Sequence, residues 1–159
     1  MKKPLTIVLT LILVLTACGN ESTISTLSYP VPDQEMHASE EGLSLTLEED
    51  AFLGSPSVIT TVVQNTSSSD YQLGEFYHIE LHKDGQWFII TYSDAVFLKN
   101  PSFKDYGNVL SAGSKARQTF SVDALGVTLI PGEYRLVKTF LSLGEPLYEL
   151  SVAVPFTVK

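Results

Sequence analysis

Two histidines and a glutamate occupy every second position of the stretch HIELH, residues 78–82. In a strand, His78, Glu80 and His82 would share one face, and all three side chains can bind metals. A strand rises about 3.3 Å per residue, so the two histidines would stand roughly 13 Å apart and could not share one ion without a bulge. Glu80 with either histidine has no evident third ligand. The sequence therefore predicts no metal site here, and we expect no cofactor.

The pair Asp84-Gly85 follows this stretch and suits the positive φ values of a two-residue type I′ turn. With such a turn, His82 lies opposite Trp87 and Glu80 lies opposite Ile89. Tryptophan is enriched at binding hot spots, so this hairpin carries a candidate binding face made of His78, Glu80, His82 and Trp87. The alternative is a turn one residue longer, which would flip every side chain and place Trp87 in the core.

The single cysteine, Cys18, lies in LVLTACGN, residues 13–20. A basic start, MKK, precedes an apolar run of 13 positions from Leu5 to Ala17, which is typical of a secretory signal peptide. The run is short for a membrane span, which needs about 20 residues; an uncleaved N-terminal helix is the alternative. The tetrapeptide Leu15–Cys18 resembles a bacterial lipobox, which implies cleavage after residue 17 and acyl chains such as palmitate on Cys18. Two or more acyl chains give stable anchoring.

The chain after the predicted signal peptide, residues 18–159, is acidic, with 8 basic and 18 acidic residues and a formal charge of 8 − 18 = −10. This charge argues against nucleic acid as a partner and against direct binding to an anionic membrane surface. We expect contact with the membrane only through the lipid, on the extracytoplasmic face. Residues 18–41 are rich in Ser, Thr, Pro and acids and predict a lipidated, flexible tether. The alternative is that Tyr29-Pro30 and Pro32 pack onto the domain.

From residue 42 onward the apolar residues recur with a period of two, which is typical of strands. The clearest cases are Leu43–Leu47, the β-branched stretch Ser57–Asn65 and the C-terminal stretch Tyr148–Val158. Turn signals rich in Gly, Pro, Asn and Asp separate the strands. The pattern predicts an all-β, antiparallel β-sandwich of about seven strands over residues 42–159. Pro155 predicts an edge or a bulge in the last strand.

The motifs for catalysis that can be recognised in a sequence do not occur. There is no G-x-S-x-G, no P-loop and no H-E-x-x-H, and three scattered histidines give no sign of a triad. We therefore expect a protein that is not an enzyme. The irregular stretch of residues 93–110 contains several aromatic residues and is either a recognition loop or a cover for the open end of the core.

The stretch PGEYRLVKTF, residues 131–140, places Tyr134 where immunoglobulin domains carry a tyrosine near the start of strand F. Leu136 then occupies the position of the second cysteine, and Val62 or a neighbour faces it from strand B. Together with DGQW, residues 84–87, and in this order, these motifs make residues 42–159 resemble a bacterial Ig-like domain of Gram-positive lipoproteins. The resemblance implies an immunoglobulin-like fold and little about mechanism. It also implies an aromatic residue after strand E, where this chain has Val122–Leu125. A weaker resemblance is to intracellular proteinase inhibitors, with which a signal peptide conflicts.

The sequence thus predicts a lipid-anchored, extracytoplasmic and non-catalytic Ig-like domain that binds a protein or an envelope ligand. Two alternatives stay open: a protease-inhibitor-like module, and a binder of small ions or small molecules through the face of His78 and His82.

Overall fold

The computed structural model describes residues 23–92 and 107–159. The described part forms eleven strands and one short 3-10 helix, and seven of the strands are four residues or longer. The predicted all-β sandwich is confirmed. No helix in the described ranges is long and apolar enough to cross a membrane. The predicted signal peptide, Cys18 and most of the predicted loop at residues 93–110 lie outside the described residues.

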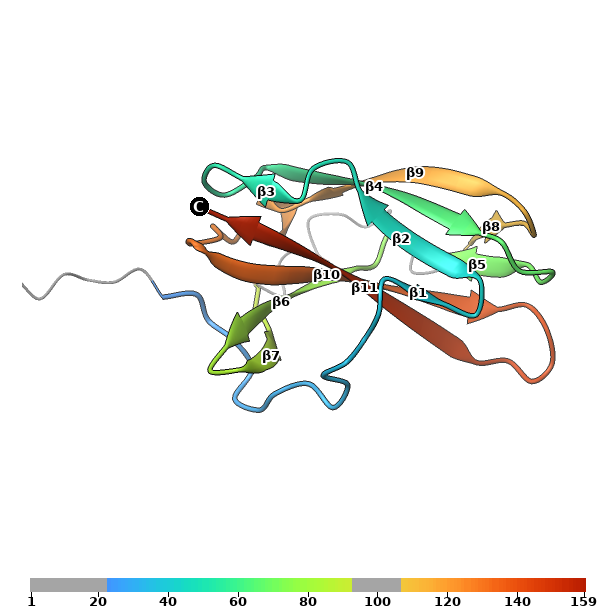
Figure 1. Ribbon diagram of the computed structural model, residues 1–159, viewed down its shortest axis with the longest axis horizontal. Coiled ribbons are helices and arrows are strands. Elements are labelled where there is room, and N and C mark those ends of the chain that lie inside the picture. Colours follow the sequence, from blue (N-terminus) through green and yellow to red (C-terminus); the bar gives the residue numbers. More distant parts are fainter. Residues whose placement is uncertain (1–22, 93–106) are drawn as a thin grey trace, which may run out of the picture.

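The strands form two sheets that stack as two layers (Figure 1). The first sheet has the order β1 (Ser39–Glu40), β2 (Leu43–Leu47), β4 (Val58–Asn65) and β9 (Lys115–Ser121). The second has the order β3 (Ala51–Phe52), β11 (Glu149–Val158), β10 (Gly132–Ser142), β5 (Tyr71–Leu73) and β8 (Asn108–Leu110). β6 (His78–Lys83) pairs with β10, and β7 (Gln86–Ile89) pairs with β6. The pairing is antiparallel except between β3 and β11, which run parallel.

The predicted alternation in the last strand is confirmed. Every second residue of β11 from Leu150 to Val158 is buried in the core between the sheets. On the outer edge of β11, Ala153 N–H donates to His37 O and Thr157 N–H donates to Asp50 O. Pro155 stands between these two outward-facing donors, at a point where no N–H is needed. The predicted edge position of this proline is therefore confirmed.

The predicted tyrosine corner is also present. The Tyr134 hydroxyl donates to Ile130 O at 2.7 Å, and its ring stacks on Phe156 with 5.4 Å between the ring centroids. Leu136 is fully buried, as expected for the position of the second cysteine. Val62 is on the outer side of β4; its neighbours Thr61 and Val63 point inward.

Replacing Tyr134 with phenylalanine is expected to lower the free energy of unfolding by about 1–3 kcal/mol, because the Ile130 carbonyl loses its buried donor. Burial raises the pKa of Tyr134, which is consistent with a hydroxyl held away from water. Urea unfolding followed by tryptophan fluorescence would measure the change, with Tyr29→Phe as the matched control on an exposed ring. Equal stability of the two variants would mean that the hydroxyl bond contributes nothing to this corner.

The resemblance implies an aromatic residue after strand E, and residues 122–125, which stand at that place, contain none. After β9 the chain enters the 3-10 helix η1 (Asp123–Leu125), and Val122 and Leu125 are buried in the core there. Aliphatic side chains thus occupy this place, next to the buried aromatic pair of Phe120 and Tyr77.

Candidate functional site

The hairpin that carries the predicted binding face has the predicted turn and register. Asp84 and Gly85 have φ values of 53° and 77°, as a type I′ turn requires. His82 pairs with Trp87, and Glu80 pairs with Ile89. The face opposite His78, Glu80 and His82 is the one that enters the core.

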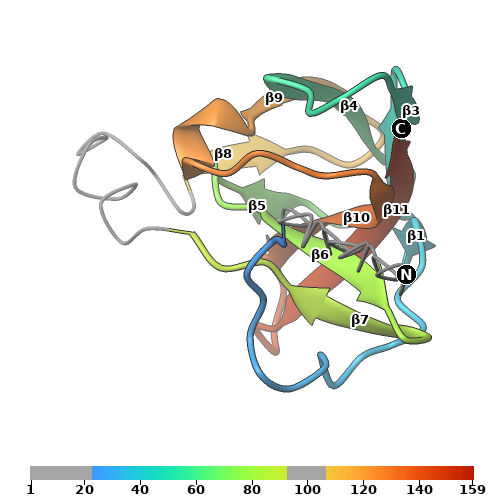
Figure 2. The same ribbon diagram turned by 90° about the vertical axis from the view of Figure 1, so that its left-hand side faces the viewer.

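This face is only partly open to solvent, because an N-terminal segment covers part of it. We call residues 24–37 the strap; Figure 2 shows it in blue beside β7. Leu27 N–H donates to Ile89 O at 2.9 Å, and Val31 N–H donates to Trp87 O at 2.9 Å. A bridge between Thr26 and Ile90 continues this antiparallel pairing.

The prediction of a flexible tether over residues 18–41 is therefore corrected for its described part. The physical reason is that β7 is an edge strand, whose outward N–H and C=O groups need partners, and the strap provides them. Tyr29 is 83% exposed and does not pack; Val31, between Pro30 and Pro32, is the buried side chain of this stretch.

Glu80 is buried, which contradicts its predicted place on an exposed face. It lies opposite Arg135 of β10, and the two side chains are 1% and 3% exposed. Arg135 Nε donates to Glu80 Oε2 at 2.6 Å, and His78 Nε2 lies 2.8 Å from Glu80 Oε1. A carboxylate can be buried here because a guanidinium compensates its charge directly.

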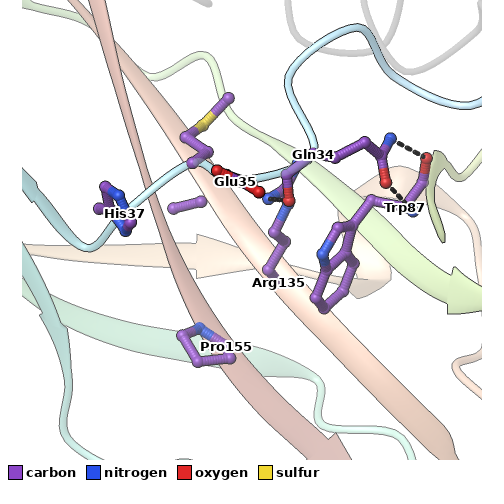
Figure 3. Close-up of a pocket in the computed structure, with 8 residues that line it drawn as sticks. Gln34, Glu35, His37, Trp87, Arg135 and Pro155 are labelled. Atoms are coloured by element: carbon purple, nitrogen blue, oxygen red, sulfur yellow. Dashed lines mark hydrogen bonds between the residues drawn. The ribbon is translucent and has the colours of Figure 1, made fainter. Parts of the chain in front are cut away.

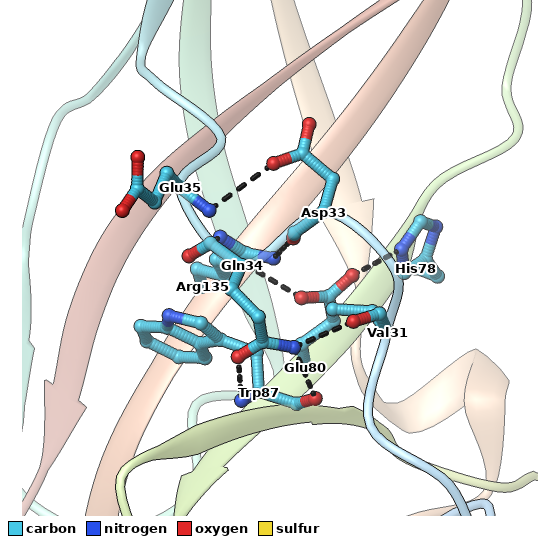
Figure 4. Close-up of polar contacts among 8 residues, drawn as sticks. All are labelled: Val31, Asp33, Gln34, Glu35, His78, Glu80, Trp87 and Arg135. Carbon is cyan, nitrogen blue, oxygen red and sulfur yellow. Dashed lines mark hydrogen bonds and ion pairs between the residues drawn. The ribbon is translucent and has the colours of Figure 1, made fainter.

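Arg135 joins the hairpin, the strap and β10 at one point (Figure 4). Its terminal nitrogens donate to Asp33 O at 2.7 Å and Gln34 O at 3.3 Å. Its guanidinium carbon lies 4.7 Å from the centroid of the Trp87 ring, a cation–π distance. Arg135 therefore fixes both the strap and the tryptophan.

Trp87 is half-buried, so neither alternative from the sequence describes it fully. It lies on the predicted face, and it is partly covered there.

The Gln34 side-chain amide binds both backbone groups of Trp87: Trp87 N–H donates to Gln34 Oε1 at 2.8 Å, and Gln34 Nε2 donates to Trp87 O at 3.3 Å. The ring of His82 lies 4.7 Å from that of Trp87, between centroids. His82 Nδ1 lies 3.0 Å from Glu133 Oε2. The tryptophan is thus held rigidly from several sides.

A shallow groove of about 340 Å³ opens beside Trp87, between the strap and the outer faces of β10 and β11 (Figure 3). Its apolar wall is formed by Trp87, Met36, Ala153 and Pro155. Its polar groups come from Gln34, Glu35, His37 and Arg135. The sequence did not indicate a contribution from the strap or from β11, which are far from the hairpin along the chain. A rigid indole beside amide, carboxylate and imidazole groups suits contact with a ligand that has both apolar surface and hydrogen-bonding groups, such as a peptide.

The described residues contain no group of three or more His, Cys, Asp and Glu side chains that could hold a metal ion. The two histidines of the predicted face are paired with different glutamates, His78 with Glu80 and His82 with Glu133. This separation follows from the geometry of a regular strand, which was the sequence argument against a shared ion.

Residues 39–157 match the family model described as a bacterial Ig-like domain. No curated protein sequence matches the chain. The family match covers both sheets, from β1 to nearly the end of β11, and leaves the strap outside.

Proposed function

The chain belongs to the bacterial Ig-like domain family, and from that premise we propose that it is a lipid-anchored recognition module without catalytic activity. It binds a protein or another envelope ligand in the groove beside Trp87, on the extracytoplasmic face of the cell membrane. The observation that carries this proposal is the groove itself: a tryptophan held rigid by Arg135 and Gln34 beside exposed side chains of the strap and β11.

A binding role fits the chemistry of the groove better than a catalytic one. The carboxylate nearest to the guanidinium, Glu80, is buried and saturated by Arg135 and His78. The described residues that line the groove include no serine, cysteine or lysine nucleophile. The ion-binding alternative has less support, because each histidine of the hairpin already has its own carboxylate. The inhibitor-like alternative stays a prediction, which a panel of proteases would test.

The lipid anchor rests on the sequence around Cys18, which follows an apolar run directly. Replacing Cys18 with serine removes the thiol that would be acylated. We expect the variant to appear unprocessed or in the medium, because the chain after residue 17 is acidic, with a formal charge of 8 − 18 = −10, and does not favour anionic lipids. Fractionation and the mass of the N-terminal peptide would measure this. A processed Cys18→Ser chain that stays in the membrane would contradict the anchor, with Ser22→Ala as the matched control.

The binding role is tested by photo-crosslinking in cells with a probe at position 37. His37 is exposed, its side chain lines the groove, and its structural bond uses the backbone carbonyl, so the probe leaves the fold intact. The control probe replaces Thr46, which is exposed on β2 of the other sheet. We expect a partner to be captured from position 37 and not from position 46. Equal capture from both positions, or none from position 37, would contradict the groove as the binding site.

A further inference from the structure

A segment of the same chain occupies the outer edge of β7. It pairs there through one antiparallel bridge, Thr26 with Ile90, bends at residues 28–29, and binds β7 again at Val31. Leu27 N–H donates to Ile89 O at 2.9 Å, Thr91 N–H donates to Ser25 O at 2.8 Å, and Val31 N–H donates to Trp87 O at 2.9 Å. We call residues 25–31 the latch. The edge therefore binds the backbone of another segment, and the bonds from Ser25 to Leu27 have the antiparallel pattern that an added strand would extend.

The latch contributes few side chains to the domain. Within it only Val31 is buried, whereas Leu27 is 48% exposed and Tyr29 is 83% exposed. Ile24, directly before the latch, is partly buried against the core and leaves it when the latch opens. Backbone bonds on a strand edge do not depend on side-chain identity, and a segment with few buried apolar contacts opens at low free energy. A different polypeptide could therefore form the same bonds with β7.

The next part of the strap is fixed more firmly. Arg135 binds the carbonyl groups of Asp33 and Gln34, the Gln34 amide brackets Trp87, and His37 O accepts from Ala153 N–H. The latch can thus leave β7 while residues 33–37 keep their place as one wall of the groove. Ile89 and Trp87 both belong to β7, and Trp87 also lines the groove, so the edge of β7 and the groove are adjacent.

We propose that the edge of β7 is a docking site for an extended segment of the partner protein, which adds as an antiparallel strand in place of the latch. This inference rests on the proposed function and names the partner as a polypeptide in strand conformation. The latch is then an internal competitor that keeps the edge covered until the partner displaces it.

Displacement of the latch also changes the reach of the domain from the proposed anchor. With the latch bound, 25 − 18 = 7 Cα–Cα steps separate Ser25 from Cys18, and they span at most about 25 Å. With the latch released, the fixed point becomes Asp33, and 33 − 18 = 15 Cα–Cα steps span at most about 54 Å. Binding of the partner would thus about double the distance to which the domain can extend from the membrane.

The test uses the full chain carrying Cys18→Ser, purified in detergent, and a synthetic peptide of residues 23–31 as the probe. Leu27→Pro removes the N–H that binds Ile89 O and opens the latch; Leu27→Ala is the matched control, because it loses the same exposed side chain and keeps the N–H. Trp87, the one tryptophan of the chain, reports binding by its fluorescence. We expect the peptide to bind Leu27→Pro about tenfold more tightly than Leu27→Ala, because the intact latch competes at an effective concentration of order mM.

A second variant, Leu27→Cys with Ile89→Cys, joins the latch to β7 by a disulfide, since a hydrogen-bonded pair in antiparallel strands stands about 5.5 Å apart. The oxidised protein should not bind the peptide, and the reduced protein should bind it again. Three results would overturn the proposal. They are equal binding of the peptide to Leu27→Pro and Leu27→Ala, binding of the peptide to the oxidised protein, and no binding to Leu27→Pro at a peptide concentration of about 1 mM, which is on the order of the effective concentration of the latch.

The same disulfide separates this inference from the proposed function. In cells, the pair of cysteines is introduced into the chain with Cys18 intact and a photo-crosslinking probe at position 37. Loss of capture in the disulfide-bonded chain would support docking on β7. Capture that persists would leave the groove as a binding site and would reject the β7 edge as its extension.

Discussion

Replacing Arg135 with methionine is expected to lower the free energy of unfolding by about 3–5 kcal/mol, because it leaves a buried carboxylate without its cation. Glu80 is 1% exposed and receives the Arg135 Nε donor at 2.6 Å. The same substitution removes the donors to Asp33 O and Gln34 O. It should therefore also loosen the strap.

Urea unfolding would measure the stability, and hydrogen exchange of the Trp87 amide, which donates to Gln34 Oε1, would report the strap. Arg117→Met is the matched control, because Arg117 is an exposed arginine whose two bonds to Glu48 lie at the surface; its unfolding midpoint should hardly change. The double variant Glu80→Leu, Arg135→Met should recover much of the stability, because neither charge then remains in the buried position. A single variant as stable as the Arg117 control would show that Glu80 is not compensated by Arg135.

The hairpin of the site could be predicted because its determinants are local. An Asp-Gly pair between two alternating segments permits the positive φ values at residues 84 and 85, and the turn then sets the pairing of His82 with Trp87. The same is true of β11, whose alternation of apolar residues reflects one buried face along a single strand.

The environment of that hairpin could not be predicted, because it depends on residues far away in the sequence. Arg135 comes from the second half of the chain, and its partner Glu80 looks like an ordinary outward residue of an amphipathic strand. A strand with alternating polar residues predicts a face away from the core, and it does not say whether another segment covers that face.

The strap was missed for a related reason. Its composition, rich in Ser, Thr, Pro and acids, is typical of chains that do not bury enough apolar surface to fold. The strap does not need that surface, because the edge of β7 supplies backbone partners at Trp87 and Ile89, and Arg135 supplies donors to two carbonyl groups. Order imposed by a strand edge leaves little trace in composition.

Replacing Asn65 with aspartate is expected to lower the free energy of unfolding by about 2–4 kcal/mol at neutral pH, although the two side chains have the same shape. Asn65 is fully buried at the end of β4. Its Nδ2 donates to Ser69 O at 2.7 Å and to Leu110 O at 3.1 Å, and its Oδ1 accepts from Ser67 N–H at 3.0 Å. In the variant, a carboxylate oxygen would face two carbonyl oxygens.

The stability of this variant should recover in part as the pH falls, because a protonated carboxyl can donate one of the two lost bonds. The introduced group is disfavoured in its charged form by burial, so its stabilising form is present at low pH and lost as the pH rises. Gln64→Glu, at an exposed position of the same strand, is the matched control and should unfold as the natural chain does. If the Asn65 variant is as stable as this control at pH 7, the amide is not needed to join β4 to β8. If the Asn65 variant is destabilised equally at every pH, the loss of stability comes from packing. It then does not come from the two hydrogen bonds that Asn65 Nδ2 donates to Ser69 O and Leu110 O.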